Sequence, residues 1–285
     1  MIPLIQAERG KGMDDLLSSY MPGHLEEAKR ITIEGNNPLV HLLKIYEKFL
    51  YTDDLPCLHK SLMAETSSIE KMIEYFKDDV RKIVLTPAEI SAFLVATIPY
   101  EKDGWYTGLT GIFVSVLIQQ SYRAGNNQFY LDVEGLPKLD NLAVLIQGTA
   151  HKPIEVSVSG NIGGHLGHGA TYALIQAASN YEFDFVGCRS QNSTIVLKGD
   201  MYDVGFHSED TDFIIHGNVK EGLFGPLLYE AQRSTCSIDG SFEGDKIKMR
   251  AKKCIFRTPN KKTYAILKKQ VPTGNRVIFL GGSKK

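Results

Sequence analysis

The chain has 285 residues, of which 43% are hydrophobic and 23% are charged, and its formal net charge is −1. This near-neutral charge does not indicate binding to nucleic acid or to an anionic membrane. The length is sufficient for two structural units with a large hydrophobic core. The longest strongly apolar run, 112–118, is too short to span a bilayer.

We expect the first 125 residues to be mainly helical. Apolar residues recur at helical spacing in four segments: 39–50, 69–84, 87–98 and 112–124. Ser67 and Glu70 form a candidate capping box for the second segment, and Thr86 with Glu89 is a stronger start for the third. The fourth segment is apolar nearly all round, which predicts a buried helix closed by Gly125.

From Asn126 onward the hydrophobic period shortens to that of a β-strand. The strands that we expect are Phe129–Glu134, Leu142–Gln147, Ile154–Ser159, Tyr181–Val186, Thr194–Lys198 and Asp212–His216. Each of them is followed at once by a glycine. Strands that all end alike indicate one repeated unit.

The glycines that are followed by Asn, Asp or Ser give the period of this unit. They stand at positions 160, 199, 217 and 240, at intervals of 39, 18 and 23 residues. These intervals fit two, one and one turns of a solenoid with roughly 20 residues per coil. Beyond the repeats we expect a helix at Lys262–Gln270, a turn and a final strand, which cap the stack or pack back on the helical region.

Glycine is densest in the segment Gly160–Ala170, with the sequence GNIGGHLGHGA. This segment resembles the repeat of the GXGXG superfamily, the right-handed β-helix found at the C-terminal end of the large chain of glutamate synthase and in one of the chains of formylmethanofuran dehydrogenase. The matching positions are Gly160, Asn161, Gly163, Gly167 and Gly169. Weaker echoes at Gly199–Gly205 and Gly217–Gly225 extend the resemblance over about Leu142–Gly244.

Together with the periodicity of the flanking segments, the resemblance predicts a multidomain α+β fold. It would have a helical domain at 1–125, a short right-handed parallel β-helix at 126–256 and a C-terminal α/β cap at 257–285. In the enzymes that contain it, this β-helix is a scaffold that packs against other domains and holds no catalytic residue. The resemblance therefore argues against catalysis in the β region and implies no cofactor.

The glycine-rich run has neither the spacing of a P-loop nor that of a dinucleotide-binding loop, so we interpret it as coil corners. At a corner, positive φ and the close approach of neighbouring coils favour glycine. Asn and Asp tolerate left-handed geometry and can stack as a ladder. The predicted corner residues are Gly160, Asn161, Gly163, Gly167, Gly169, Gly199, Asp200, Gly217 and Asn218.

Histidines give the first candidate site. His165, His168 and His207 follow glycines at comparable positions, and three imidazoles on one edge could bind Zn²⁺ or another divalent metal. Exposed turn histidines without a ligand role are the simpler interpretation. Cys188 precedes Arg189, whose charge could lower the pKa of the thiol, but no histidine is paired with it by spacing. No residue is assigned a catalytic role.

The second candidate site is the segment Trp105–Gly111, which places the only tryptophan beside three glycines at the start of the most buried helix. A helix N-terminus with aromatic neighbours suits a small anion or a partner's chain. A tight connector that docks the helix under the β region is the structural alternative. The candidate ligand-binding residues are Trp105, Tyr106, Thr107 and Gly108.

Two basic clusters, Lys246–Lys253 and Lys261–Lys269, are interpreted as solvated strand faces. The cysteines stand far apart without a CxxC pair, which argues against a zinc ribbon and a disulfide framework: Cys57, Cys188, Cys236 and Cys254. Residues 1–15 lack the apolar core of a signal peptide. We therefore expect a cytoplasmic protein with reduced thiols.

Three hypotheses for the function follow. The leading one is a non-catalytic scaffold or protein-interaction subunit, whose flat β-helix faces bind another protein or a second copy and neither nucleic acid nor membrane. The alternative is an enzyme or small-ligand-binding protein with its site at the seam between the helical domain and the β-helix. The third is a metal-binding protein that uses the turn histidines.

Overall fold

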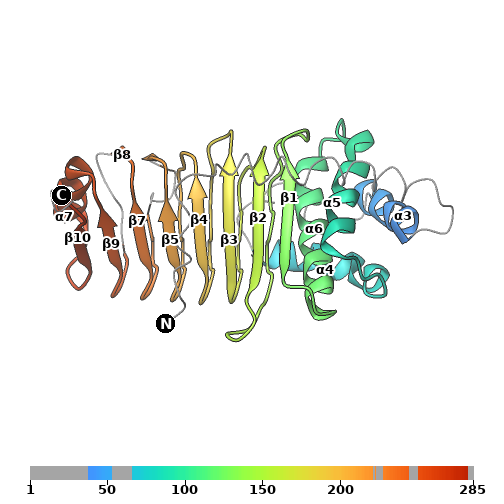
Figure 1. Cartoon of the computed structure of the whole chain (residues 1–285), viewed down its shortest axis with the longest axis horizontal. Coiled ribbons are helices and arrows are strands. Elements are labelled where there is room, and N and C mark those ends of the chain that lie inside the picture. Colours follow the sequence, from blue (N-terminus) through green and yellow to red (C-terminus); the bar gives the residue numbers. More distant parts are fainter. Residues whose placement is uncertain (1–37, 53–65, 221, 223–226, 244–249, 282–285) are drawn as a thin grey trace.

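The computed structural model describes residues 38–52, 66–220, 222, 227–243 and 250–281. It has a helical region followed by a parallel β-solenoid of about six turns (Figure 1). The helical elements are α3 (Pro38–Leu50), α4 (Thr66–Val80), α5 (Pro87–Ala96), the 3₁₀ turn η1 (Ile98–Tyr100), α6 (Tyr106–Arg123) and α7 (Lys261–Gln270). The strands are β1 (Gln128–Val133), β2 (Ile154–Gly160), β3 (Ala173–Ser179), β4 (Thr194–Lys198), β5 (Asp212–Ile215), β6 (Val219–Lys220), β7 (Thr235–Ile238), β8 (Phe242–Glu243), β9 (Ile255–Thr258) and β10 (Arg276–Phe279).

Local signals account for the helices. Thr86 Oγ1 accepts a hydrogen bond from Glu89 N, and the Glu89 carboxylate accepts one from Thr86 N at 2.7 Å, so the predicted capping box opens α5. Gly125 follows α6 with φ +113°. The helix α4 begins at Thr66 and ends short of the predicted boundary. Some of the predictions concern parts of the chain outside the described residues: 1–15, Cys57, the Ser67 side chain and 246–249.

The helical region packs around Phe113 of α6. The ring of Phe113 stacks on Phe76 at 4.9 Å and on Phe93 at 5.3 Å, centroid to centroid. α6 is buried along most of its length, as its all-round apolar sequence predicts. None of the helices in the described ranges combines the length and the apolarity that crossing a membrane requires.

The solenoid is built on one sheet of parallel strands with the order β1-β2-β3-β4-β5-β7-β9-β10. Paired residues lie one coil apart: Thr194 pairs with Asp212, and Asp212 pairs with Thr235. These steps of 18 and 23 residues equal the last two glycine intervals of the sequence. The predicted period of roughly 20 residues is therefore confirmed. A smaller sheet pairs β6 with β8.

Two of the predicted strands are wrong. Residues 142–147 and 181–186 form corners with isolated bridges, in which residues such as Ala143, Leu145 and Phe185 have positive φ. Both corners contribute buried apolar side chains to the core, such as Leu142 and Val144 in the first and Phe183 and Val186 in the second, as a strand would. The strands β3, β7 and β9 were not predicted.

Each of five successive corners contains two residues, two positions apart, with positive φ. The pairs are Ala143/Leu145, Gly167/Gly169, Gly187/Arg189, Gly205/His207 and Leu228/Glu230. Among the predicted corner residues, positive φ is found at Gly160, Gly167, Gly169 and Gly199. Gly217 has a different reason to be glycine, because a Cβ there would lie 1.9 Å from the Gly199 carbonyl oxygen of the neighbouring coil. At Gly163 a Cβ would meet the Asp140 carboxylate at the same distance.

The polar residues that follow the strands form a ladder from coil to coil. Asp200 Oδ1 accepts hydrogen bonds from N and Nδ2 of Asn218 at 2.9 and 3.0 Å. Asn218 Oδ1 in turn accepts from N and Oγ of Ser241 at 2.8 and 2.9 Å. Asn161 donates to two carbonyls of the preceding coil. Asn161, Asp200 and Asn218 do not have positive φ, so bonds to backbone, not left-handed geometry, explain these residue types.

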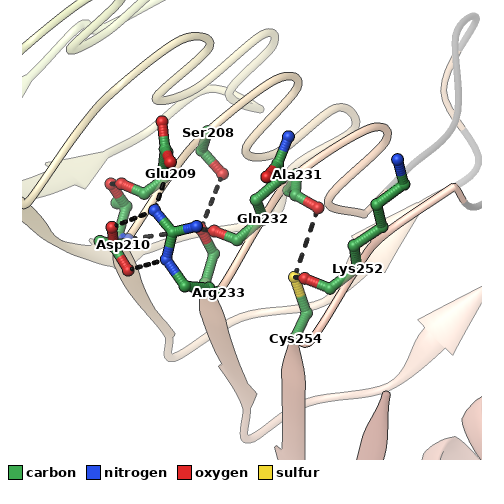
Figure 2. Close-up of polar contacts among 10 residues, drawn as sticks. Ser208, Glu209, Asp210, Ala231, Gln232, Arg233, Lys252 and Cys254 are labelled. Atoms are coloured by element: carbon green, nitrogen blue, oxygen red, sulfur yellow. Dashed lines mark hydrogen bonds and ion pairs between the residues drawn. The ribbon is translucent and has the colours of Figure 1, made fainter. Parts of the chain in front are cut away.

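A column of short polar side chains lines the corners that precede β4, β5, β7 and β9, and Figure 2 shows it at Cys254. Its members are Ser193, Thr211, Ser234 and Cys254, and each donates to the carbonyl two residues before it. Ser208 and Ser234 also bond each other at 3.2 Å. On the outer side, Arg233 forms ion pairs with Glu209 and Asp210. The column satisfies corner carbonyls inside the coil.

The last coil contains α7 and β10, as the tail sequence predicts. Asn260 Oδ1 accepts from two N–H groups in the first turn of α7. The Thr263 hydroxyl donates to Gly240 O and accepts from Phe242 N, so α7 binds the edge of the smaller sheet. The basic cluster 261–269 therefore lies on a helix and not on a strand face, which corrects its interpretation. Figure 1 shows the helical region and α7 at opposite ends of the row of strands.

Candidate functional site

The seam between the helical region and the solenoid is the contact of α6 with the first coil. A Cβ on Gly111 would lie 1.9 Å from Asp140 O, so only glycine allows the helix to approach this closely. Thr107 O accepts a hydrogen bond from Asp140 N at 3.2 Å, and Gly108 O accepts one from Asn141 Nδ2 at 3.4 Å. The first turn of α6 is therefore bonded directly to the corner of the coil.

Polar side chains one turn apart continue this contact along α6. Ser115 Oγ donates to Gly111 O at 2.7 Å and accepts from Val144 N at 3.1 Å. Gln119 bonds both backbone groups of Gln147, accepting from N at 2.6 Å and donating to O at 3.2 Å. These side chains form hydrogen bonds with backbone groups that, elsewhere in the solenoid, would be hydrogen-bonded to a preceding coil.

The four predicted ligand-binding residues differ in their surroundings. Tyr106 is fully buried and its hydroxyl shares a 2.9 Å hydrogen bond with Thr97, while burial raises its pKa. Thr107 and Gly108 use their carbonyls in the seam. Only Trp105 is substantially exposed, at 39%. Of these four residues, the structure therefore shows Thr107 and Gly108 in the contact between helix and coil, Tyr106 buried beside Thr97, and Trp105 exposed.

The three predicted metal ligands are not brought together. His165 and His168 are buried, with ring centroids 6.0 Å apart, and His165 stacks on Phe185 at 5.0 Å. The backbone hydrogen bonds between coils align His207 with Arg189 and Gly169 of the two preceding coils. His207 is therefore shifted by one residue relative to His168, and its side chain faces outward. The described part of the chain contains no group of three or more His, Cys, Asp or Glu side chains that could hold a metal ion.

Burial determines the chemistry of both inner histidines. It lowers the pKa of each imidazole from its ordinary value of 6.5 to about 4. A smaller contribution to the lower pKa comes from proximity to His168 in the case of His165, and from Arg189 in the case of His168. Neither ring nitrogen of His165 has a hydrogen-bond partner among the described residues. His207 has a different environment, since its Nδ1 lies 3.3 Å from a carboxylate oxygen of Glu230 near the surface. At neutral pH the inner pair is uncharged.

Cys188 does not have the environment of a reactive thiol. Its side chain is buried and donates to Phe185 O, and burial raises its pKa to about 12 despite the neighbouring Arg189. The described cysteines Cys188, Cys236 and Cys254 are all free and buried. Cys188 therefore remains protonated at neutral pH, and its side chain packs in the hydrophobic core.

The sequence analysis did not identify the C-terminal end of the solenoid as a site. Residues 250–281 contain nine Lys or Arg and no Asp or Glu. They form the corner before β9, then β9, α7 and β10, at the end of the sheet opposite the helical region (Figure 1). The uniform sign of charge is a signal that the sequence contains, but only the stacking of these elements shows that it gathers at one end.

No protein-family model matches the chain, and comparisons with curated proteins and with solved structures find no significant match. The function must therefore be inferred from the described residues themselves. In the described part, the two ends of the solenoid differ both in hydrogen bonding and in charge.

Proposed function

We propose that this protein is a non-catalytic scaffold that binds another protein through the C-terminal end of its solenoid. The observation that carries the proposal is the difference between the two ends of the eight-stranded sheet. At the first end, side chains of α5 and α6 bond the outermost backbone. At the last end, β10 pairs with β9 and with no other strand of the described residues.

The bonding at the first end is extensive. Besides Ser115 and Gln119, the Ser91 hydroxyl donates to Tyr130 O at 2.8 Å, and the Tyr122 hydroxyl donates to Lys152 O at 2.6 Å. A strand edge without such cover is a template for a further strand. A protein that covers one edge and leaves the other available is suited to binding there.

The finer description of the fold belongs to this proposal. We propose a right-handed β-helix of the GXGXG type, with the helical segment 1–125 and the tail 257–285 as separate units. The recurring pairs of left-handed residues support it, because Gly167 and Gly169 supply one such pair and the other corners repeat it. The free thiols of Cys188, Cys236 and Cys254 support a cytoplasmic location.

Binding to proteins of the cells that produce it tests the proposal. The full chain is immobilised, and the retained proteins are compared with those retained by Val277→Pro, which alters the outer edge of β10, and by Val277→Ala, which does not. The expected result is a near-stoichiometric partner, or a second copy, that the proline variant loses and the alanine variant keeps. A chain that is monomeric and retains no protein in any form contradicts the proposal.

A further inference from the structure

The last coil carries a strong and unbalanced positive charge. Its nine basic residues are Arg250, Lys252, Lys253, Arg257, Lys261, Lys262, Lys268, Lys269 and Arg276. All of them except Arg257 are exposed. Within the described part of the chain, only Arg250 has an ion-pair partner, Glu230 at 3.1 Å. The mutual repulsion of these charges decreases when an anionic group binds among them.

The outer edge of β10 offers backbone hydrogen bonds. Arg276 N donates to Cys254 O and Leu280 N donates to Thr258 O, each at 2.9 Å, so these residues are directed toward β9. Because alternate residues of a parallel strand bond opposite neighbours, the N–H and C=O groups of Val277 and Phe279 are directed away from β9. No other described strand pairs with them.

Apolar and basic side chains meet beside this edge. Phe279 is 37% exposed, and its ring lies 5.4 Å from the ring of Tyr264 on α7, centroid to centroid. Lys268 Nζ lies 5.7 Å from the centroid of the same tyrosine ring. The exposed Leu280 follows at the end of the strand. A chain bound along β10 would therefore contact apolar surface and lysine ammonium groups together.

We propose that an extended, acidic segment of another protein binds as an additional strand along the outer edge of β10, with its carboxylates beside the basic residues of the last coil. This inference rests on the proposed scaffold function and specifies its partner. A second copy of the chain is disfavoured, because pairing two β10 edges would bring two sets of nine positive charges together. The unpaired strand edge favours a peptide over a nucleic acid or a membrane.

Fluorescence anisotropy with labelled peptides and the full-length protein tests the inference. The probe is a short peptide that alternates Glu with Val. One comparison peptide has the same charge but contains proline at alternate positions, and another replaces each Glu by Lys. We expect the Glu–Val peptide to bind about tenfold more tightly than the proline peptide, because the latter lacks strand hydrogen bonds, and the Lys peptide not to bind.

Two pairs of variants locate the binding. Val277→Pro removes an outward N–H and should weaken the Glu–Val peptide about fivefold or more, while Val277→Ala keeps the N–H and should bind nearly as wild type. Lys268→Glu/Lys269→Glu should weaken binding about tenfold, whereas the same charge change far away in α3 and α4, Lys44→Glu/Lys71→Glu, should have little effect. If circular dichroism shows that the proline variant does not fold, the comparison of the two charge-reversal variants tests the inference on its own.

Several outcomes overturn the inference. It is wrong if the proline peptide binds as tightly as the Glu–Val peptide, if the charge-reversal pairs behave alike, or if a DNA oligonucleotide or phosphatidylserine vesicles bind while the peptide does not. If no peptide binds, but the full chain retains a protein partner that the Val277→Pro variant loses, the acidic-strand inference fails and the scaffold function stands. If neither the peptide nor a protein partner binds, both fail.

Discussion

The two ends of the solenoid present the same structural problem, an outermost strand with one unpaired edge, and they meet it differently. At the first end, α6 places Gly111, Ser115 and Gln119 one turn apart along the face that meets the coil. Gly111 allows the close approach, and Ser115 and Gln119 bond the backbone of the first coil at Val144 and Gln147. At the last end, α7 bonds the smaller sheet through Thr263 and leaves the outer edge of β10 without a described partner.

The charges of the two ends differ in the same sense. The described helices α3 to α6 mix acidic with basic side chains, and some of them pair, such as Lys48 with Asp79 at 3.3 Å. The last coil is basic throughout. The first end therefore has a mixed-charge surface above backbone that is already hydrogen-bonded. The last end combines a strand edge available for hydrogen bonding with a positive electrostatic potential that attracts anions.

The largest effect is expected where the first end is closed most tightly. Gly111→Ala places a Cβ 1.9 Å from Asp140 O and forces α6 away from the coil, which should lower the free energy of unfolding by about 3 kcal/mol. The matched control is Gly104→Ala, whose Cβ would have no neighbour within 4 Å. Urea unfolding of both variants measures the difference. Equal stability of the two variants would show that the seam is not closely packed.

Acid should weaken the coil next to the first end. The pKa of His165 and of His168 is about 4 in the folded chain and 6.5 in the unfolded chain, so the unfolded chain binds more protons between these values. Stability is therefore complete above pH 6.5 and falls as the pH drops toward 4. At pH 5 the loss should be about 2 kcal/mol for each histidine.

The variant His165→Phe tests this assignment, because Phe185 occupies the equivalent position of the next coil with similar φ. Unfolding measured between pH 8 and pH 4.5 should show a smaller loss of stability in the variant than in the wild type. Identical pH profiles would mean that His165 is accessible to protons in the folded state.

Loss of one seam hydrogen bond should have a moderate effect. Ser115→Ala removes the acceptor of the buried Val144 N–H, which should cost about 2 kcal/mol of unfolding free energy. The comparison variant is Ser91→Ala, whose exposed hydroxyl bonds Tyr130 O and should contribute less than about 1 kcal/mol. Chemical denaturation of the two variants ranks them. The reverse order would contradict the role given to α6.

The smallest effect is expected at a corner of the last coil. Lys253 has φ +57°, so Lys253→Gly relieves left-handed strain and should stabilise the chain by up to about 1 kcal/mol. The neighbouring Lys252 is equally exposed but has no positive φ, so Lys252→Gly should destabilise by about 0.5 kcal/mol. Thermal melts give the sign for each variant. The same sign in both would show that the corner geometry does not govern these positions.

The sequence predicted the solenoid because glycine spacing reports the coil period directly. It mislocated two strands because the apolar side chains of these corners are buried in the core, as those of a strand are. A better signal was present: GCRSQNST at 187–194 and GFHSEDTD at 205–212 share a glycine, a serine and a hydroxyl residue at equal spacing. In the structure these are the left-handed corner and the column of Ser193 and Thr211.

The candidate sites were harder to predict. The burial of His165 and His168 depends on the direction of side chains in a corner, which a sequence does not reveal. The spacing placed His207 beside them, yet one position of register turns its side chain outward. The basic end is formed by a corner, a helix and two strands that lie together only in the folded structure. When each lysine cluster is considered separately in the sequence, it predicts only a solvent-exposed face.

The central claim is that the outer edge of β10 is a binding surface. Residue-resolved amide hydrogen exchange of the full chain tests it most directly. In the free protein, the amides of Val277 and Phe279 should exchange much faster than that of Ile278, which faces β9 by the same register. On addition of the Glu–Val peptide, Val277 and Phe279 should become protected. Slow exchange of both amides in the free protein, or no change on binding, would contradict the claim.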